Sequence, residues 1–93
     1  MQVIWNPQKA LSNLKKHGVD FADAVVALED RNALTIMDAS EGEYRFKTLA
    51  RGTNPDILFI VHTEQDENTI RLISARVATS NERKQYFEGD YHE

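Results

Sequence analysis

The chain has 93 residues, of which 41% are hydrophobic and 28% charged, and this fits one small globular domain over 1–93. It contains no cysteine, which excludes disulfides and thiolate metal sites and is compatible with a reducing cytoplasm. The formal net charge is −4, which argues against bulk nucleic-acid binding but leaves room for a local basic cleft. No apolar run approaches the roughly 20 residues that span a bilayer, so we expect a cytoplasmic protein with no membrane partner.

The first third of the chain predicts a short strand and two helices. Residues 2–5 favour a strand, and the Asn-Pro pair that follows can cap and open a helix over 7–16. Gly18 suits the left-handed position that closes such a helix. A second helix is expected over about 20–29. The apolar residues at helical spacing are Ala10, Leu11 and Leu14 in the first helix and Phe21, Ala24, Val25 and Leu28 in the second.

The rest of the chain predicts four strands and a final helix. The strands are expected at 33–37, 43–50, 57–63 and 69–77. Short turns between them favour antiparallel neighbours, and the last two strands are apolar on both faces, so they should be central. A capping-box sequence, Thr79 to Glu82, opens a helix that Gly89 can close. The fold class is therefore α+β, in the order β-α-α-β-β-β-β-α.

Strand parity assigns the arginines of the predicted sheet to its two faces. In the strand over 43–50, alternation places Arg45 and Lys47 together on a solvent-exposed face. In the last strand, Arg71 and Arg76 have opposite parity, so they should lie on opposite faces. If Arg76 faces a cleft, Arg71 is then a scaffold residue or faces solvent.

Four separated segments carry a combined pattern: WNPQKALSNLKKHGVDF, EYRF, VHT, and IRLISAR followed by AT, ER and Tyr86. Together they resemble the BrnT family, the toxins of a type II toxin–antitoxin system, which are similar to RelE-type ribonucleases. The resemblance covers nearly the whole chain, and it is specific because the separate segments agree in order and spacing. Asn6 stands where the family usually has Asp, and either residue caps a helix.

The resemblance implies a compact RelE-like fold with helices packed on an antiparallel sheet. It also implies endonucleolytic cleavage of RNA and growth inhibition by blocked translation. We expect this cleavage to be metal-independent and to use no cofactor. A BrnA-like ribbon-helix-helix antitoxin would neutralise it, and the complex would bind DNA only indirectly, through the antitoxin.

RNA cleavage without a metal needs a cation for the negative charge of the transition state, and arginine meets phosphate with a planar, permanently charged fork. We predict that Arg76 and Arg45 are these phosphate ligands. For Arg76 the alternative is an ion pair with Glu82 or a bond to a helix-terminal carbonyl. For Arg45 the alternative is a cross-strand pair with an acid such as Glu43.

Proton transfer also needs an acid and a base, and the candidates are His17, Tyr86 and Glu82. His17 can equally cap the C-terminus of its helix. Tyr86 can stack on a base or hydrogen-bond a phosphate, or it can anchor its helix to the sheet. Glu82 suits the capping box before it suits proton transfer. The junction before the last helix can return Arg83 and Tyr86 towards Arg76.

Three further cations, Lys9, Lys16 and Arg83, are candidates for positioning RNA, although a solvated helix face also explains the two lysines. His62 and His92 are interpreted as incidental. The three histidines are 45 and 30 residues apart and give no metal-site signature. The rival interpretation is a noncatalytic binding module that docks a partner protein through an apolar surface and a charged rim, with the arginines as interface anchors.

Overall fold

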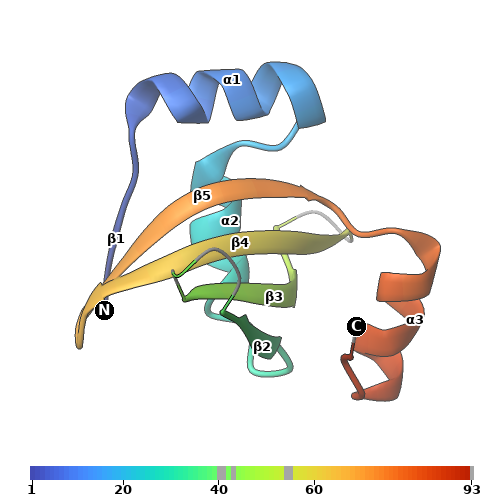
Figure 1. The fold of residues 1–93 in the computed structure, drawn as a ribbon. Coiled ribbons are helices and arrows are strands. Elements are labelled where there is room, and N and C mark those ends of the chain that lie inside the picture. Colours follow the sequence, from blue (N-terminus) through green and yellow to red (C-terminus); the bar gives the residue numbers. More distant parts are fainter. Residues whose placement is uncertain (40–41, 43, 54–55, 93) are drawn as a thin grey trace.

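The computed structural model describes residues 1–39, 42, 44–53 and 56–92. The element order is the predicted one (Figure 1). The elements are β1 (Gln2–Ile4), α1 (Pro7–His17), α2 (Phe21–Ala27), β2 (Leu34–Asp38), β3 (Arg45–Arg51), β4 (Ile57–Asp66), β5 (Thr69–Val77) and α3 (Ser80–Glu88).

The helices begin and end at the predicted caps, with one difference. The Asn6 side chain accepts the first free amides of α1, and the Thr79 capping box opens α3. Helix α2 ends at Ala27, earlier than expected, because Glu29 and Asp30 donate to carbonyls three residues back. Such bonds tighten the last turn and stop the regular helix.

The five strands form one sheet in the order β1-β5-β4-β3-β2. Strands β2 to β5 pair antiparallel, as predicted from the short turns, and β4 is the central strand. Strand β1 pairs parallel with β5, because two helices separate it from the other strands along the chain. The sheet is therefore mostly antiparallel.

Helix α2 packs on one face of the sheet and α3 on the other, while α1 runs along the β5 edge, where Asn13 bonds the backbone of Ala75 (Figure 1). Neighbouring residues of one strand show the division: Leu58 belongs to the main core under α2, whereas Ile57 belongs to a small cluster with Leu49 and Tyr86 of α3. Since α3 packs over one end of its face, the remaining part of that face is available to form a site.

The ladder between β4 and β5 contains a β-bulge that changes where the arginines lie. Its register pairs Phe59 with Arg76 but Thr63 with Arg71, and shifts between Val61 and His62. Paired residues share a face, and Phe59 and Thr63 are four apart, so Arg71 and Arg76 lie on the same face. The prediction of opposite faces was wrong, because the bulge adds one residue to β5 between the two arginines.

Candidate functional site

The face of the sheet on which α3 packs has cations on both sides of its central strand. Register places Lys47 of β3 and Arg71 and Arg76 of β5 on this face, and strand alternation adds Arg45. The intervening residues of β4 are uncharged. We call this surface the basic sheet face; its members are Arg45, Lys47, Phe59, Val61, Thr63, Arg71 and Arg76.

Arg76 is held in a defined position at one end of this face. Its Nη1 and Nη2 donate to the two carboxylate oxygens of Glu82 at 2.8 and 3.0 Å, and Nη1 also donates to the Val77 carbonyl at 3.2 Å. The guanidinium carbon lies 4.1 Å from the centre of the Phe59 ring. The ion pair considered as the alternative for Arg76 is therefore present.

This ion pair leaves part of the Arg76 guanidinium available. Among the described residues, the hydrogen bonds just named use three of its five N–H groups. The Nε–H and the second Nη2–H form the other edge of the fork, which can meet two phosphate oxygens. Burial alone would raise the pKa of Glu82, but hydrogen bonds from Arg76 and Thr79 outweigh burial and lower it. Glu82 is thus an ionised carboxylate that orients Arg76.

A cavity of about 480 Å³ lies beside Arg76 and is lined in part by Lys47, Glu82 and His92. The Nζ of Lys47 lies 3.1 Å from a carboxylate oxygen of Asp38. The backbone N–H of His92 donates to the buried side chain of Gln85 at 2.9 Å, which holds the tail against this cavity. From the sequence, His92 was interpreted as incidental. Gly89 predicted where α3 ends, but no residue predicted where the tail that follows it packs.

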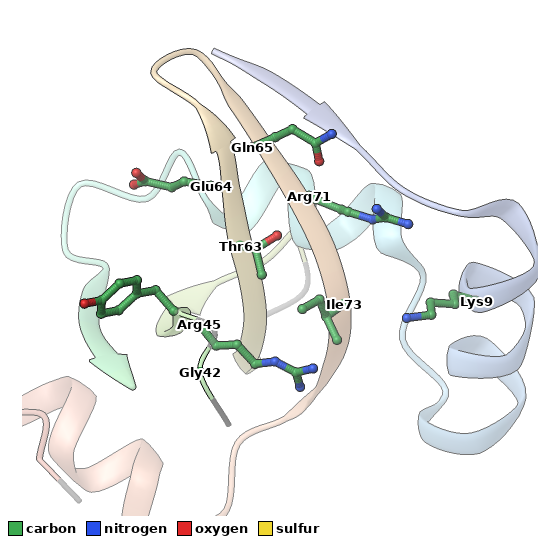
Figure 2. A pocket seen from close by; sticks show the side chains of 9 residues that line it. Lys9, Gly42, Arg45, Thr63, Glu64, Gln65, Arg71 and Ile73 are labelled. Carbon is green, nitrogen blue, oxygen red and sulfur yellow. The ribbon is translucent and has the colours of Figure 1, made fainter. Parts of the chain in front are cut away.

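A second cavity of about 730 Å³ lies at the other end of the basic sheet face (Figure 2). Three separate elements supply cations around it: Lys9 from α1, Arg45 from β3 and Arg71 from β5. Tyr44, an exposed aromatic residue, also lines it. Arg45 therefore lies on the predicted face, while its suggested partner Glu43 lies outside the described residues.

His17 and Lys16 lie on the α1 side of β5, where they line a small cavity of about 230 Å³. Lys9 and Ile73 line this cavity and the larger one at the basic sheet face, so the two are neighbours. Within the part of the chain that the structure describes, neither His17 nor Lys16 lines the Arg76 cavity.

Tyr86 is buried and points away from Arg76. Its hydroxyl donates to the carboxylate of Asp30 at 2.5 Å, and burial together with this hydrogen bond raises its pKa. Tyr86 lines a cavity on the other side of α3, and Arg83 lies over the ring of Phe87. The expected return of Tyr86 towards Arg76 is therefore wrong, because Tyr86 anchors α3 to the loop that contains Asp30.

A comparison with known protein families identifies the family of this chain. The family described as the ribonuclease toxin BrnT of a type II toxin–antitoxin system matches residues 5–82. The chain belongs to the BrnT family. It is thus a BrnT ribonuclease toxin of a type II system, and the matched segment includes every cation of the basic sheet face.

A solved BrnT structure has the same fold. The crystal structure of the Brucella abortus ribonuclease toxin BrnT matches with a TM-score of 0.69 and 24% sequence identity, over 86% of this chain and 99% of that chain. At this identity the likeness concerns the fold. No curated protein matches the chain.

Two further properties of this BrnT chain concern metal binding and membrane insertion, over its described residues. Among them, no group of three or more His, Asp or Glu side chains is arranged to hold a metal ion. None of the helices described above is both long enough and apolar enough to cross a membrane.

Proposed function

We propose that this BrnT chain is an endoribonuclease that cleaves RNA on the basic sheet face without a metal, and that it inhibits translation in the cytoplasm. The observation that carries the proposal is the environment of Arg76. Its charge is permanent, Glu82 and Phe59 hold it in place, and one edge of its fork can receive a phosphate. A cation fixed before the substrate arrives stabilises a charged transition state without further reorganisation.

In the proposed reaction, the 2′-OH of one nucleotide attacks the adjacent phosphorus and the 5′-oxygen of the next nucleotide leaves, which gives a cyclic phosphate. Arg76 binds the phosphate whose charge grows. Glu82, an ionised carboxylate, is assigned to accept the proton of the 2′-OH, and His92, which lines the same cavity, is assigned to donate a proton to the leaving 5′-oxygen. Arg45 and Arg71 hold neighbouring phosphates, and Lys9 and Lys16 extend the contacts towards α1.

The type II family implies a protein antitoxin as well as an RNA substrate. We assign this role to a BrnA-like ribbon-helix-helix protein that covers the basic sheet face and thereby blocks RNA, with DNA contacted only through the antitoxin. The noncatalytic alternative differs in one respect: Arg76 would then serve complex formation and not cleavage.

The test compares cleavage of single-stranded RNA by wild type, Arg76→Ala, Arg76→Lys and the control Lys15→Ala, with and without ribosomes. We expect Arg76→Ala to lose about 100-fold or more in rate, with Arg76→Lys between it and wild type. Lys15 is exposed on α1, so its replacement should leave the rate unchanged. If wild type cleaves no better than Arg76→Ala in both settings, the assignment fails and the noncatalytic alternative gains support.

A further inference from the structure

An exposed phenylalanine lies on the side of α3 away from the Arg76 cavity. Phe87 is 55% exposed, and two guanidinium groups lie over its ring, that of Arg83 at 5.1 Å and that of Arg51 at 5.5 Å from the ring centre. Arg31 joins Arg51 and Phe87 in lining a cavity of about 500 Å³. We call the four residues Arg31, Arg51, Arg83 and Phe87 the Phe87 platform.

The partly exposed carboxylate of Asp30 holds the platform together. Asp30 accepts from the Tyr86 hydroxyl at 2.5 Å and from the backbone N–H of Arg51 at 2.9 Å. It thus joins α3, the end of β3 and the loop that contains Arg31, which are the three segments that supply the platform. Burial alone would raise the pKa of Asp30, but the hydrogen bonds it accepts and the charge of Arg51 lower it. The carboxylate is therefore ionised, and the platform is positioned before any ligand binds.

We propose that the Phe87 platform binds a second segment of the RNA, several nucleotides from the phosphate at Arg76. An exposed aromatic ring surrounded by arginines offers a stacking surface for a base and forked donors for its phosphates. Two arginines over one ring, with Arg31 lining the same cavity, form a basic cluster on a chain whose net charge is −4. The proposal rests on RNA being the substrate, and it adds a contact outside the cleavage site.

The position of α3 makes this path short. Glu82 and Gln85 of α3 line the Arg76 cavity, whereas Phe87 of the same helix lines the platform cavity. An α-helix with its side chains is about 10–12 Å across, so a single strand can leave Arg76 and reach Phe87 by crossing one helix. Arg83 and Phe87 lie beyond residues 5–82, so the family match does not include this contact. RNA long enough to cross α3 should bind more tightly than RNA confined to the sheet face.

The test measures binding of fluorescently labelled single-stranded RNA to the full chain in an Arg76→Ala background, in which cleavage is expected to be about 100-fold slower. One RNA is long enough to cross α3, and one is too short. We expect Phe87→Ala, and separately the pair Arg51→Ala with Arg83→Ala, to weaken binding of the long RNA about tenfold and to leave the short RNA unchanged. Phe87→Trp should keep the affinity, and Lys84→Ala, an exposed cation of the same helix, is the matched control.

Three results would overturn the inference. They are unchanged affinity of the long RNA, equal losses for both RNAs, and unchanged RNA affinity with lost neutralisation by the antitoxin, which would identify a protein-docking surface instead. Thermal unfolding of each variant separates binding from folding, since Phe87 is exposed and its replacement should leave stability unchanged. Because cleavage is not the readout, absence of cleavage by wild type would refute the proposed activity without deciding the platform.

Discussion

His62 shows how burial changes the role of a single residue. Its side chain is 5% exposed, its ring stacks on Phe46, and its Nε2 lies 2.9 Å from the hydroxyl of Thr48. Burial lowers its pKa to about 4, since a charged imidazole in the core would lose its hydration. At neutral pH His62 is therefore an uncharged core residue. In the sequence, a histidine within an apolar strand did not reveal which face it occupies.

The first prediction concerns stability and pH. The pKa of His62 is about 4 in the folded chain and about 6.5 in the unfolded chain, so on acidification the unfolded state binds the proton first. Between pH 7 and pH 5 the free energy of unfolding should fall by about 2 kcal/mol through this residue. His62→Gln should remove that fall, whereas His17→Gln should retain it. Urea unfolding at pH 7 and at pH 5 measures the free energy of unfolding of each protein. An equal fall between the two pH values in wild type and His62→Gln would contradict the assignment.

At the level of elements, α1 makes hydrogen bonds to the backbone of β5 that a neighbouring strand would otherwise make. Strand β1 pairs with three residues of β5, and further along the same strand Asn13 of α1 bonds Ala75. The Asn13 side chain accepts from the Ala75 N–H at 3.1 Å and donates to the Ala75 and Val19 carbonyls at 2.8 and 3.0 Å. These contacts satisfy backbone groups that would otherwise be buried without partners.

The same helix shows why some features were predicted from sequence and others were not. Its ends depend on Asn6 and Gly18, which act on adjacent backbone, so local sequence predicted them. Its buried side depends on tertiary contacts: Leu11 and Leu14 of the predicted apolar stripe are 63% and 42% exposed, whereas Asn13 is buried. The bulge that brings Arg71 to the basic sheet face likewise depends on the pairing of β5 with β4. Alternation along β5 alone does not predict it.

Removing the Asn13 side chain tests its part in the fold. Asn13→Ala leaves two carbonyls and one N–H unpaired in the interior, and we expect the free energy of unfolding to fall by about 3 kcal/mol. Ser12→Ala, at the exposed neighbouring position, should change it by less than about 0.5 kcal/mol. Urea unfolding compares the two. Similar small losses in both variants would mean that water replaces the Asn13 contacts without cost.

At the scale of the whole molecule, positively and negatively charged side chains gather on different surfaces. The chain is acidic, yet the cations of the basic sheet face gather on one side of the sheet, and acids such as Asp20, Asp23 and Asp56 line a cavity near α2. At physiological ionic strength, exposed charges farther apart than about 8 Å are largely screened from each other. Phosphates that reach the basic sheet face therefore respond mainly to its three arginines and Lys47, and the net charge of −4 does not prevent local binding.

This separation predicts how RNA affinity depends on salt. Each phosphate neutralised on a single strand contributes about −0.7 to the slope of log affinity against log salt, because bound counterions are released. In the Arg76→Ala background, Arg45→Ala and Arg71→Ala should each make the slope less steep by about 0.7, whereas Lys15→Ala on the outer side of α1 should leave it unchanged. Fluorescence anisotropy titrations over a range of salt concentrations measure these slopes. Equal slopes in all four proteins would mean that RNA binds elsewhere, since no phosphate would then be neutralised by the basic sheet face.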